Sequence, residues 1–446
     1  MQQSSDLTTG DIGEHIKKMA LPAAIGLFFQ AMYNATDAYY VGQLSVTALA
    51  AVSISFPIYF LILAMGSGLG TATNALTSKA RGEKNFEKAK NLAMQSILFA
   101  IFLSVLASIV GLATADVVFS AIGAKGDTHL LALEYMNMIY YGLFFFFLVM
   151  VLNGLLNSIG DTKAFGYVLV FGFFLNIILD PLFMYGGFGF PAMGVAGVAL
   201  ATVVTQIIST IALGYKVVKN NLLFFSFKPD LALWTKLATQ SIPVTFQHSS
   251  VALGFLIIIK FVSDFGDNAI AVFGIGTRID QLLILPAIGI ATAVVPLVGQ
   301  NYGAKKFGRI LDIYQKSIRY SMIFLVLAII PVMLFAENLA AIFTTNTQIT
   351  RMTAEYLRIT ALAYISTAIA IISSSVLQGL IKAHLSLIFT LLRFFIIGIP
   401  AIMLFAYFLG LREMGIWLAI LISSLIVALF GYWYVLKTIR KLGPSL

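Results

Sequence analysis

The sequence predicts an all-α membrane protein with twelve transmembrane helices, arranged as two parallel six-helix repeats around a central cavity. Three observations predict this fold: the composition is apolar, the apolar stretches are long enough to cross a bilayer, and the chain repeats itself. Sixty per cent of the 446 residues are hydrophobic and 11% are charged, and the mean hydropathy is +0.95. Because soluble domains carry about 25% charged residues, we expect lipid to surround most of this chain.

Twelve apolar segments have the length of a transmembrane helix, which needs about 20 residues. They are residues 16–42, 47–77, 92–114, 131–157, 164–187, 192–217, 236–263, 268–300, 314–336, 352–381, 385–409 and 414–437. The connections between them are short, and the polar N-terminal residues lack the pattern of a signal peptide. We therefore expect an N-terminal lobe of residues 1–217, a cytoplasmic linker of residues 218–235 and a C-terminal lobe of residues 236–446.

The basic residues indicate the orientation in the membrane. Lys and Arg gather on one side of the predicted segments, with one cluster formed by Lys79, Arg81, Lys84, Lys88 and Lys90. The opposite side receives only Lys125, Arg351, Arg358 and Arg412. Since cytoplasmic connections carry the excess of positive charge, we expect both termini to lie in the cytoplasm.

An internal repeat relates the two halves at a constant offset of 221 residues. The matched pairs include Pro22 with Pro243, Gly68 with Gly289, Thr71-Ala72 with Thr292-Ala293, Glu134-Tyr135 with Glu355-Tyr356, and Met193-Gly194 with Met414-Gly415. Each half holds six segments, so both halves enter the membrane from the same side. Parallel repeats of this kind are typical of transporters, whose substrate lies between the two halves.

Three acidic residues lie inside the predicted segments: Asp37, Asp180 and Asp280. A carboxylate in the bilayer costs roughly 2.5–3.5 kcal/mol on insertion scales, so it should face a cavity, a partner or an ion. Asp37 and Asp180 lie at similar depths, roughly 24–29 Å from the cytoplasmic start of their helices at about 1.5 Å per residue. With Asn176 one turn before Asp180, and Thr202 on the next segment, they form an oxygen-rich set. This set suits Na⁺ or a proton shared between the carboxyls; the alternative is a structural, hydrogen-bonded carboxyl.

A polar stripe follows the first segment, because Gln30, Tyr33, Asn34 and Asp37 recur at helical spacing. Polar groups facing lipid would lack hydrogen-bond partners, so the stripe should face a cavity or a neighbouring helix. Pro22 removes a backbone hydrogen bond from the same helix and could let it bend. Its repeat, Pro243, allows the alternative that the bend is architectural.

The second half carries its own charges inside the predicted segments: Lys260, Arg278, Asp280 and Arg393. They suggest an internal polar network, which would be either a structural set of ion pairs or a part of the substrate and coupling machinery. Asp37 aligns with Ile258 and Asp180 with Ala401 across the repeat, so the paired carboxyls belong to the first half alone.

No enzyme is expected. The sequence lacks the motif GxxxxGK[ST], shows no zinc-binding or Ser-His-Asp pattern, and contains no cysteine. The run Gly66-Ser67-Gly68-Leu69-Gly70 lacks the strand that precedes a nucleotide-binding fingerprint, and small-residue helix packing explains it better. We expect no cofactor beyond the coupling ion, H⁺ or Na⁺.

Several motifs of this chain resemble the multidrug and toxic compound extrusion (MATE) family of the multidrug/oligosaccharidyl-lipid/polysaccharide flippase superfamily. They are Pro22, Asp37-Ala38-Tyr39-Tyr40-Val41-Gly42, Lys79-Ala80-Arg81-Gly82, Gln300-Asn301-Tyr302-Gly303, Gly160-Asp161-Thr162-Lys163 and Leu179-Asp180-Pro181. The resemblance covers nearly the whole chain. The set Asp37, Asn176, Asp180 and Thr202 is similar to the first-lobe cation site of the prokaryotic DinF-type branch. Other branches carry further acids in spans seven and ten, where this chain has Lys260 and no central acid.

The resemblance implies a secondary active multidrug efflux antiporter in the cell inner membrane. Such a protein exports organic cations and amphiphiles in exchange for H⁺ or Na⁺ by alternating access, and Pro22 is placed for the bend of span one that the family uses. Asn153 resembles a fourth-span member of the same polar network, although it lies deeper. The expected partners are small amphiphilic or cationic substrates and the lipid bilayer, with no nucleic acid, and the protein is expected to be a monomer.

Two other functions stay open at this point. A flippase for lipid-linked oligosaccharides or other lipids would use Lys260, Arg278 and Arg393 to bind an anionic headgroup. An intramembrane enzyme or receptor belongs to a different class, and neither predicts two halves of six spans.

Overall fold

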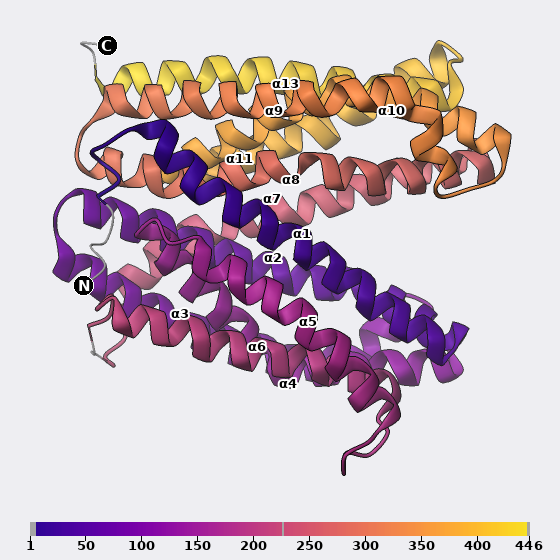
Figure 1. Cartoon of the computed structure of the whole chain (residues 1–446), viewed down its shortest axis with the longest axis horizontal. Coiled ribbons are helices and arrows are strands. Elements are labelled where there is room, and N and C mark those ends of the chain that lie inside the picture. The colour runs from indigo at the N-terminus through magenta and orange to yellow at the C-terminus, as the bar shows by residue number, and fades with distance from the viewer. Residues whose placement is uncertain (1–5, 225–226, 444–446) are drawn as a thin grey trace. The chain divides into compact units, whose positions relative to one another are not determined.

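The computed structural model describes residues 6–224 and 227–443, and helices account for almost all of them (Figure 1). The helices are α1 (Ile12–Leu44), α2 (Val46–Gly82), α3 (Phe86–Ala121), α4 (Gly126–Ser158), α5 (Lys163–Tyr185), α6 (Gly194–Lys219), α7 (Leu231–Ser263), α8 (Asp267–Gly303), α9 (Phe307–Ala341), α10 (Thr347–Gly379), α11 (Ala383–Leu391), α12 (Ile399–Ile402) and α13 (Arg412–Leu442). Two π-helices, η1 (Leu392–Gly398) and η2 (Met403–Phe408), join α11 and α12 into one span. Within the described residues, extended structure is limited to a bridge between Gly187 and Phe190.

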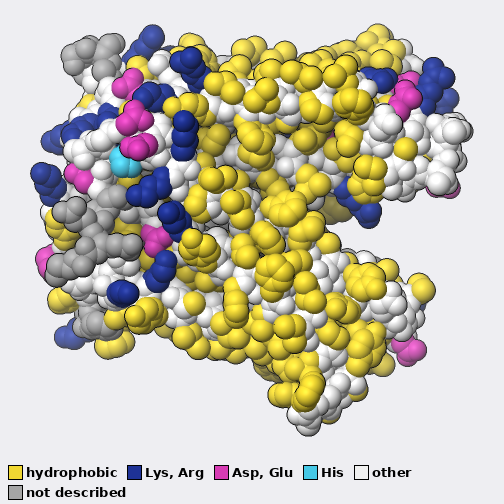
Figure 2. Space-filling model, in the orientation of Figure 1, with side chains coloured by type: hydrophobic (Ala, Val, Ile, Leu, Met, Phe, Trp, Pro, Cys, Tyr) yellow, Lys and Arg dark blue, Asp and Glu magenta, His cyan; other side chains and the backbone are white. Residues whose placement is uncertain are grey.

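The prediction of twelve transmembrane helices is confirmed. Eleven helices in the described part of the chain are long and apolar enough to cross a membrane. The twelfth, α1, is long enough at 33 residues, but the polar stripe at Gln30, Asn34 and Asp37 lowers its hydropathy. Hydrophobic side chains cover the flanks of the helices, and charged side chains gather at their ends (Figure 2). The chain is therefore a multi-pass membrane protein.

The repeat extends to the helix boundaries. Helices α2 and α8 begin and end 221 residues apart, and so do α4 and α10. The turns after α2 and α8 also match, because Lys84 has φ 58° and Lys305 has φ 57°. In each half a central helix makes its most extensive contacts with three neighbours: α4 with α2, α3 and α6, and α10 with α8, α9 and α13.

Small residues allow the central helix of the first half to approach its neighbour. A Cβ atom built on Gly154 of α4 would lie 3.1 Å from the carbonyl carbon of Gly70 in α2. A Cβ atom on Gly70 would meet the backbone of Met150 at 3.0 Å. The glycine run in α2 therefore serves close helix packing, as its composition predicts.

The chain divides into two compact units. One comprises Ile25–Thr245, and the other comprises Leu7–Ala24 together with the chain from Phe246 onward. The first part of α1 thus belongs to the second unit and the first part of α7 to the first, which differs from the lobes expected from sequence. The unit boundary in α1 lies two residues after Pro22, and the boundary in α7 lies two residues after Pro243. A proline removes a backbone hydrogen bond from its helix.

Packing explains why these two helix starts lie in the opposite unit. Leu7, Ile16 and Met19 are buried in the hydrophobic core of the second unit. Trp234, near the start of α7, lies against Phe99 and Phe102 of α3, with ring centroids 5.2 and 5.4 Å apart. Hydropathy shows where a span begins, but it carries no information about which helices the span packs against.

Candidate functional site

A carboxyl cluster lies inside the first unit, where α1, α5 and α6 meet. Asn176, Asp180 and Thr202 are buried, with at most 1% of each residue exposed. The side-chain amide of Asn176 donates a hydrogen bond of 2.8 Å to Oδ1 of Asp180, one turn further along α5. Asp37 of α1 is partly buried and joins them. Its carboxyl lies close enough to Asp180, Asn176 and Thr202 to interact with their side chains. The structure thus brings together the four residues that the sequence singled out.

Several oxygens of this carboxyl cluster are buried and have no hydrogen-bond partner among the described residues. They are Oδ1 of Asp37, Oδ2 of Asp180, Oδ1 of Asn176 and the hydroxyl of Tyr33. A buried acceptor without a partner costs about 1–3 kcal/mol, and more when it is charged. Two carboxylates and an amide oxygen are hard ligands of the kind that alkali cations prefer, and a protonated carboxyl could donate to its neighbour instead. The residues therefore fit either Na⁺ or H⁺.

A small cavity lies beside the carboxyl cluster, within the same unit. It is lined by Gln30, Tyr33, Asn34, Tyr59, Leu63, Val149, Met150, Phe165, Val168, Leu169, Gly172, Thr205, Gln206 and Ser209. The polar stripe of α1 therefore faces the interior of the unit. The volume of about 40 Å³ has room for one or two water molecules and is far below the roughly 300 Å³ of a drug-sized pocket.

Two asparagines of α4, one partly buried and one buried, are not among the residues that line this cavity. Asn153, which the family resemblance pointed to, and Asn157 one turn later each have a buried Oδ1 without a hydrogen-bond partner in the described chain. Sequence reasoning missed Asn157, although its spacing of one helical turn from Asn153 was a signal. Sequence reasoning also missed Tyr59 of α2, whose side chain lies near Asp37 of α1.

The charges of the second half do not form one network. Asp280 of α8 accepts hydrogen bonds from the hydroxyls of Tyr356 at 2.6 Å and Tyr364 at 2.5 Å, both on α10. Lys260 instead pairs with Asp264 at 3.3 Å at the end of α7, and 78% of its side chain is exposed. Arg278 is exposed as well. The two tyrosines were missed because sequence does not show which helices face one another.

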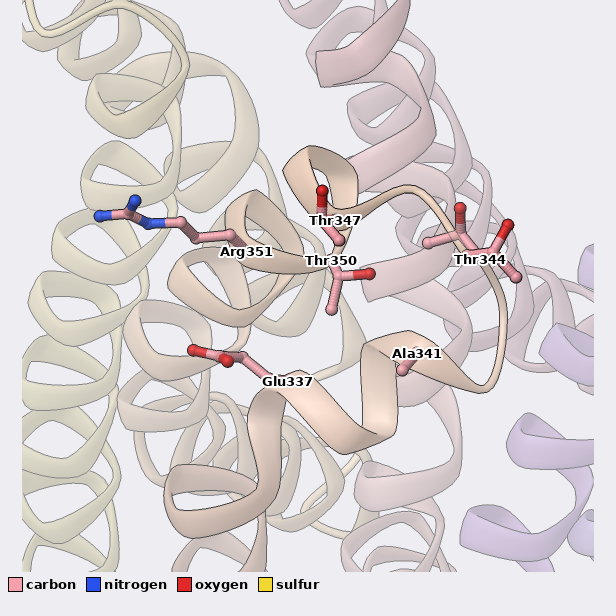
Figure 3. Close-up of a pocket in the computed structure, with 7 residues that line it drawn as sticks. Glu337, Ala341, Thr344, Thr347, Thr350 and Arg351 are labelled. Carbon is pink, nitrogen blue, oxygen red and sulfur yellow. The ribbon is translucent and has the colours of Figure 1, made fainter.

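A second hollow lies where α9 meets α10, with a volume of about 570 Å³ (Figure 3). It is lined by Glu337, Ala341, Thr344, Thr345, Thr347, Thr350 and Arg351. Glu337 pairs with Arg358 at 3.7 Å, and Arg351 pairs with Glu355 at 3.7 Å. None of the site residues expected from sequence lines this hollow.

The model of one protein family, MatE, matches this chain twice, over residues 22–182 and again over residues 243–404. The chain belongs to the MATE family. The two matches begin at Pro22 and Pro243, 221 residues apart, so the family's unit coincides with the repeat. The family assignment makes this chain a membrane transporter.

Relatives within the MATE family differ in what their names say they carry. The "FAD transporter" of Shewanella oneidensis is 28% identical over 437 residues, which cover 97% of this chain and 96% of that protein. The "Multidrug export protein MepA" of Staphylococcus aureus is 26% identical over 413 residues, which cover 91% of this chain and 90% of that protein.

Solved structures of transporters agree with the fold. A MATE transporter in its bent conformation superposes with a TM-score of 0.93 at 27% identity, covering 100% of this chain and 99% of that one. A transporter of the MOP superfamily from Pyrococcus furiosus superposes with a TM-score of 0.91 at 27% identity, covering 99% of both chains. For the latter protein, a reversed polarity of the binding pocket suggests a different function.

Proposed function

We propose that this MATE transporter is a secondary active antiporter, which exports organic cations and other amphiphiles in exchange for H⁺ or Na⁺. The observation that carries the proposal is the pair Asp37 and Asp180, each of which has one buried oxygen without a hydrogen-bond partner in the described chain. Family membership supports transport, and the names of the multidrug relatives support amphiphilic substrates.

The carboxyl pair supplies a reason for coupling. Two carboxylates held close together repel one another, and each is costly to keep charged inside a membrane protein. A bound Na⁺ or H⁺ removes that cost, so the ion stabilises one arrangement of α1 against α5 and α6. A ligand shifts a conformational equilibrium by its difference in affinity for the two states. An ion that binds one state of this cluster can therefore drive the change that releases substrate.

We place Pro22 at the bend of α1 in this cycle. It lies two residues before the division between the two units, at a point where the helix has lost a backbone hydrogen bond. We further propose that Gln30, Tyr33 and Asn34 form the polar wall of the substrate and ion path, because they line the cavity beside the carboxyl cluster. The protein would work as a monomer in the cell inner membrane, with both termini in the cytoplasm.

Transport in proteoliposomes tests the proposal. The vesicles contain a fluorescent organic cation, and a pH gradient or a Na⁺ gradient is imposed separately. We expect one gradient to drive flux in the wild type and Asp37→Asn to abolish it. Asp116→Asn is the matched control, because Asp116 is exposed and pairs with His129 away from the carboxyl cluster. Undiminished gradient-driven flux in the double variant Asp37→Asn, Asp180→Asn would contradict the coupling role.

A second candidate function is transport of a phosphate-bearing amphiphile, such as a dinucleotide or a lipid-linked sugar. A partly buried arginine in the second unit, Arg393, favours it, and so does the name of the Shewanella FAD transporter. The same vesicles loaded with FAD distinguish the candidates. Gradient-driven release of FAD without release of the organic cation would select the second.

A further inference from the structure

Arg393 lies inside the second unit without an acidic partner. Its guanidinium donates a hydrogen bond of 3.0 Å to the hydroxyl of Thr367 on α10 and lies 5.1 Å from the ring centre of Phe394. None of the ion pairs formed by the described residues of this unit includes Arg393. An intramembrane arginine is costly and normally pairs with an acid or serves function. The missing acid therefore points to a ligand.

The backbone around Arg393 is unusual. Arg393 belongs to the π-helix η1, and π-helices are rare and frequently lie at functional sites. A Cβ atom built on Gly398, five residues later, would lie 2.6 Å from the carbonyl oxygen of Arg393. Glycine at this position therefore permits the wide turn that carries the arginine.

The aromatic ring beside the guanidinium, that of Phe394, packs against apolar neighbours. The ring of Phe394 packs against Gly254 of α7 and lies 6.0 Å from the ring of Phe255. A guanidinium has five N–H donors, and Thr367 accepts from one nitrogen of Arg393. Because two oxygens of one oxyanion can accept two parallel hydrogen bonds from the planar guanidinium, a phosphate or a carboxylate matches the remaining donors.

The partly buried acid of α8, Asp280, is already engaged by two tyrosines of α10. Tyr364 lies one turn before Thr367, and its hydroxyl donates to Oδ1 of Asp280. Tyr356 donates to the other oxygen, Oδ2. Each oxygen of this carboxylate thus has a phenol donor, which leaves the positive charge of Arg393 for another partner.

The internal repeat relates Arg393 to a residue that lines the cavity of the first unit. Subtracting 221 gives Gly172, which lines the cavity beside the carboxyl cluster in the first unit. The same offset relates Phe255 to Asn34, another lining residue. The second unit therefore carries a guanidinium at the counterpart of a cavity-lining position of the first unit. The carboxyls themselves align with Ile258 and Ala401, so the charged groups of the two units occupy different positions of the repeat.

We propose that Arg393 and Thr367 form a subsite for an oxyanion, the phosphate or carboxylate of an amphiphilic substrate. This inference rests on the proposed transport function, because it names a class of substrate for it. An anionic or zwitterionic amphiphile would place its oxyanion on the guanidinium and its apolar part against Phe394 and Phe255. The oxyanion can belong to a soluble molecule or to a lipid headgroup.

Binding to the purified full-length protein tests the subsite independently of transport. The probes are flavin mononucleotide and riboflavin, which share a fluorescent ring system and differ by one phosphate. We expect the wild type to bind the phosphorylated probe about tenfold tighter, a difference of about 1.4 kcal/mol. Arg393→Gln should abolish the preference while leaving riboflavin binding unchanged, and Arg393→Lys should retain part of it. Thr367→Val, which keeps the charge, should reduce the preference.

The controls separate this proposal from its alternatives. Arg278→Gln removes an exposed cation of the same unit and should leave the preference unchanged. No preference in the wild type, or an equal loss of both probes in Arg393→Gln and Thr367→Val, would overturn the subsite. Nanodiscs with and without phosphatidic acid identify the source of the oxyanion. If phosphatidic acid weakens binding of flavin mononucleotide to the wild type but not to Arg393→Gln, the oxyanion is that of a lipid headgroup. If phosphatidic acid does not weaken that binding, the oxyanion belongs to a soluble substrate.

Discussion

The amide of Asn176 donates a hydrogen bond of 2.8 Å to Oδ1 of Asp180. Oδ1 of Asn176 and Oδ2 of Asp180 are buried and have no hydrogen-bond partner in the described chain. Asn176 thereby fixes the carboxylate and presents its own Oδ1 on the same side of α5. An asparagine used only to satisfy the aspartate would not need a buried, unpaired acceptor. The pair is therefore better suited to holding a third group, which we take to be the coupling ion.

Replacing Asn176 should weaken ion binding without removing a carboxylate. We expect Asn176→Leu to lower the affinity for the coupling ion by about 10–100-fold, the loss typical for residues that orient a ligand. The measurement is the ion concentration that gives half-maximal transport. Asn220→Leu is the control, because Asn220 bonds to the carbonyl of Lys216 at the end of α6. An unchanged half-maximal concentration in Asn176→Leu would assign Asn176 a purely structural role.

Gly154 should tolerate no side chain. A methyl group there would press on the backbone of Gly70 across the contact of α4 with α2, and overpacking of this kind costs about 1–3 kcal/mol. We expect Gly154→Ala to lower the melting temperature in detergent. Gly42→Ala is the matched control, since a Cβ atom at Gly42 meets nothing within 4 Å. Equal melting temperatures for the two variants would show that α2 and α4 can separate at little cost.

Sequence predicts well what a single helix determines. The spacing of Asn176 and Asp180 fixed their shared face, and the offset between Pro22 and Pro243 located the repeat that the family model also follows. It predicts poorly what depends on packing between helices. Tyr356 and Tyr364 reach Asp280 from another helix, and no periodicity in either helix shows this. The wide turn at Arg393 has no reliable sequence signal either, because π-helices use the same residue types as α-helices.

The absence of cysteine allows the topology to be measured with single substitutions. We expect a cysteine at Glu87, in the first turn of α3 and within the basic cluster, to resist a membrane-impermeant maleimide added to intact cells. A cysteine at Lys125, before α4, should react, because the positive-inside rule places it on the opposite side. Both positions are exposed, so burial cannot explain a difference. The reverse pattern of labelling would invert the proposed orientation.

Asp264 should give the contact of α7 with η2 a dependence on acid pH. The hydroxyl of Tyr407 donates a hydrogen bond of 2.6 Å to the carboxylate of Asp264. This bond and the hydrogen bond from Lys260 lower the pKa of Asp264 below its ordinary value. A lowered pKa in the folded state stabilises the protein above the unfolded value of about 4. That stabilisation is lost as the pH falls through the lower, folded pKa.

Tyr407→Phe removes the strongest of these interactions. We expect the variant to melt below the wild type at neutral pH and the difference to shrink below about pH 4, the ordinary range for Asp. Melting curves between neutral and strongly acid pH measure it. Tyr141→Phe serves as the control, because Tyr141 is exposed on α4. A difference that persists unchanged into strong acid would mean that Tyr407 stabilises through packing alone.

Gln95 should hold the start of α7 in the first unit. Its side-chain amide donates a hydrogen bond of 2.8 Å to the carbonyl of Lys228. Its side-chain oxygen accepts hydrogen bonds from the backbone N–H of Asp230 and the indole N–H of Trp234, each at 2.9 Å. Gln95 is 1% exposed, so Gln95→Leu deprives the backbone of Asp230 and the indole of Trp234 of their acceptor inside a partly buried contact. We expect faster proteolysis between α6 and α7 in this variant than in the wild type. Gln348→Leu, at the exposed start of α10, is the control. If the cleavage rate is unchanged, the stacking of Trp234 on Phe99 and Phe102 suffices to hold this segment, and the side chain of Gln95 is dispensable for it.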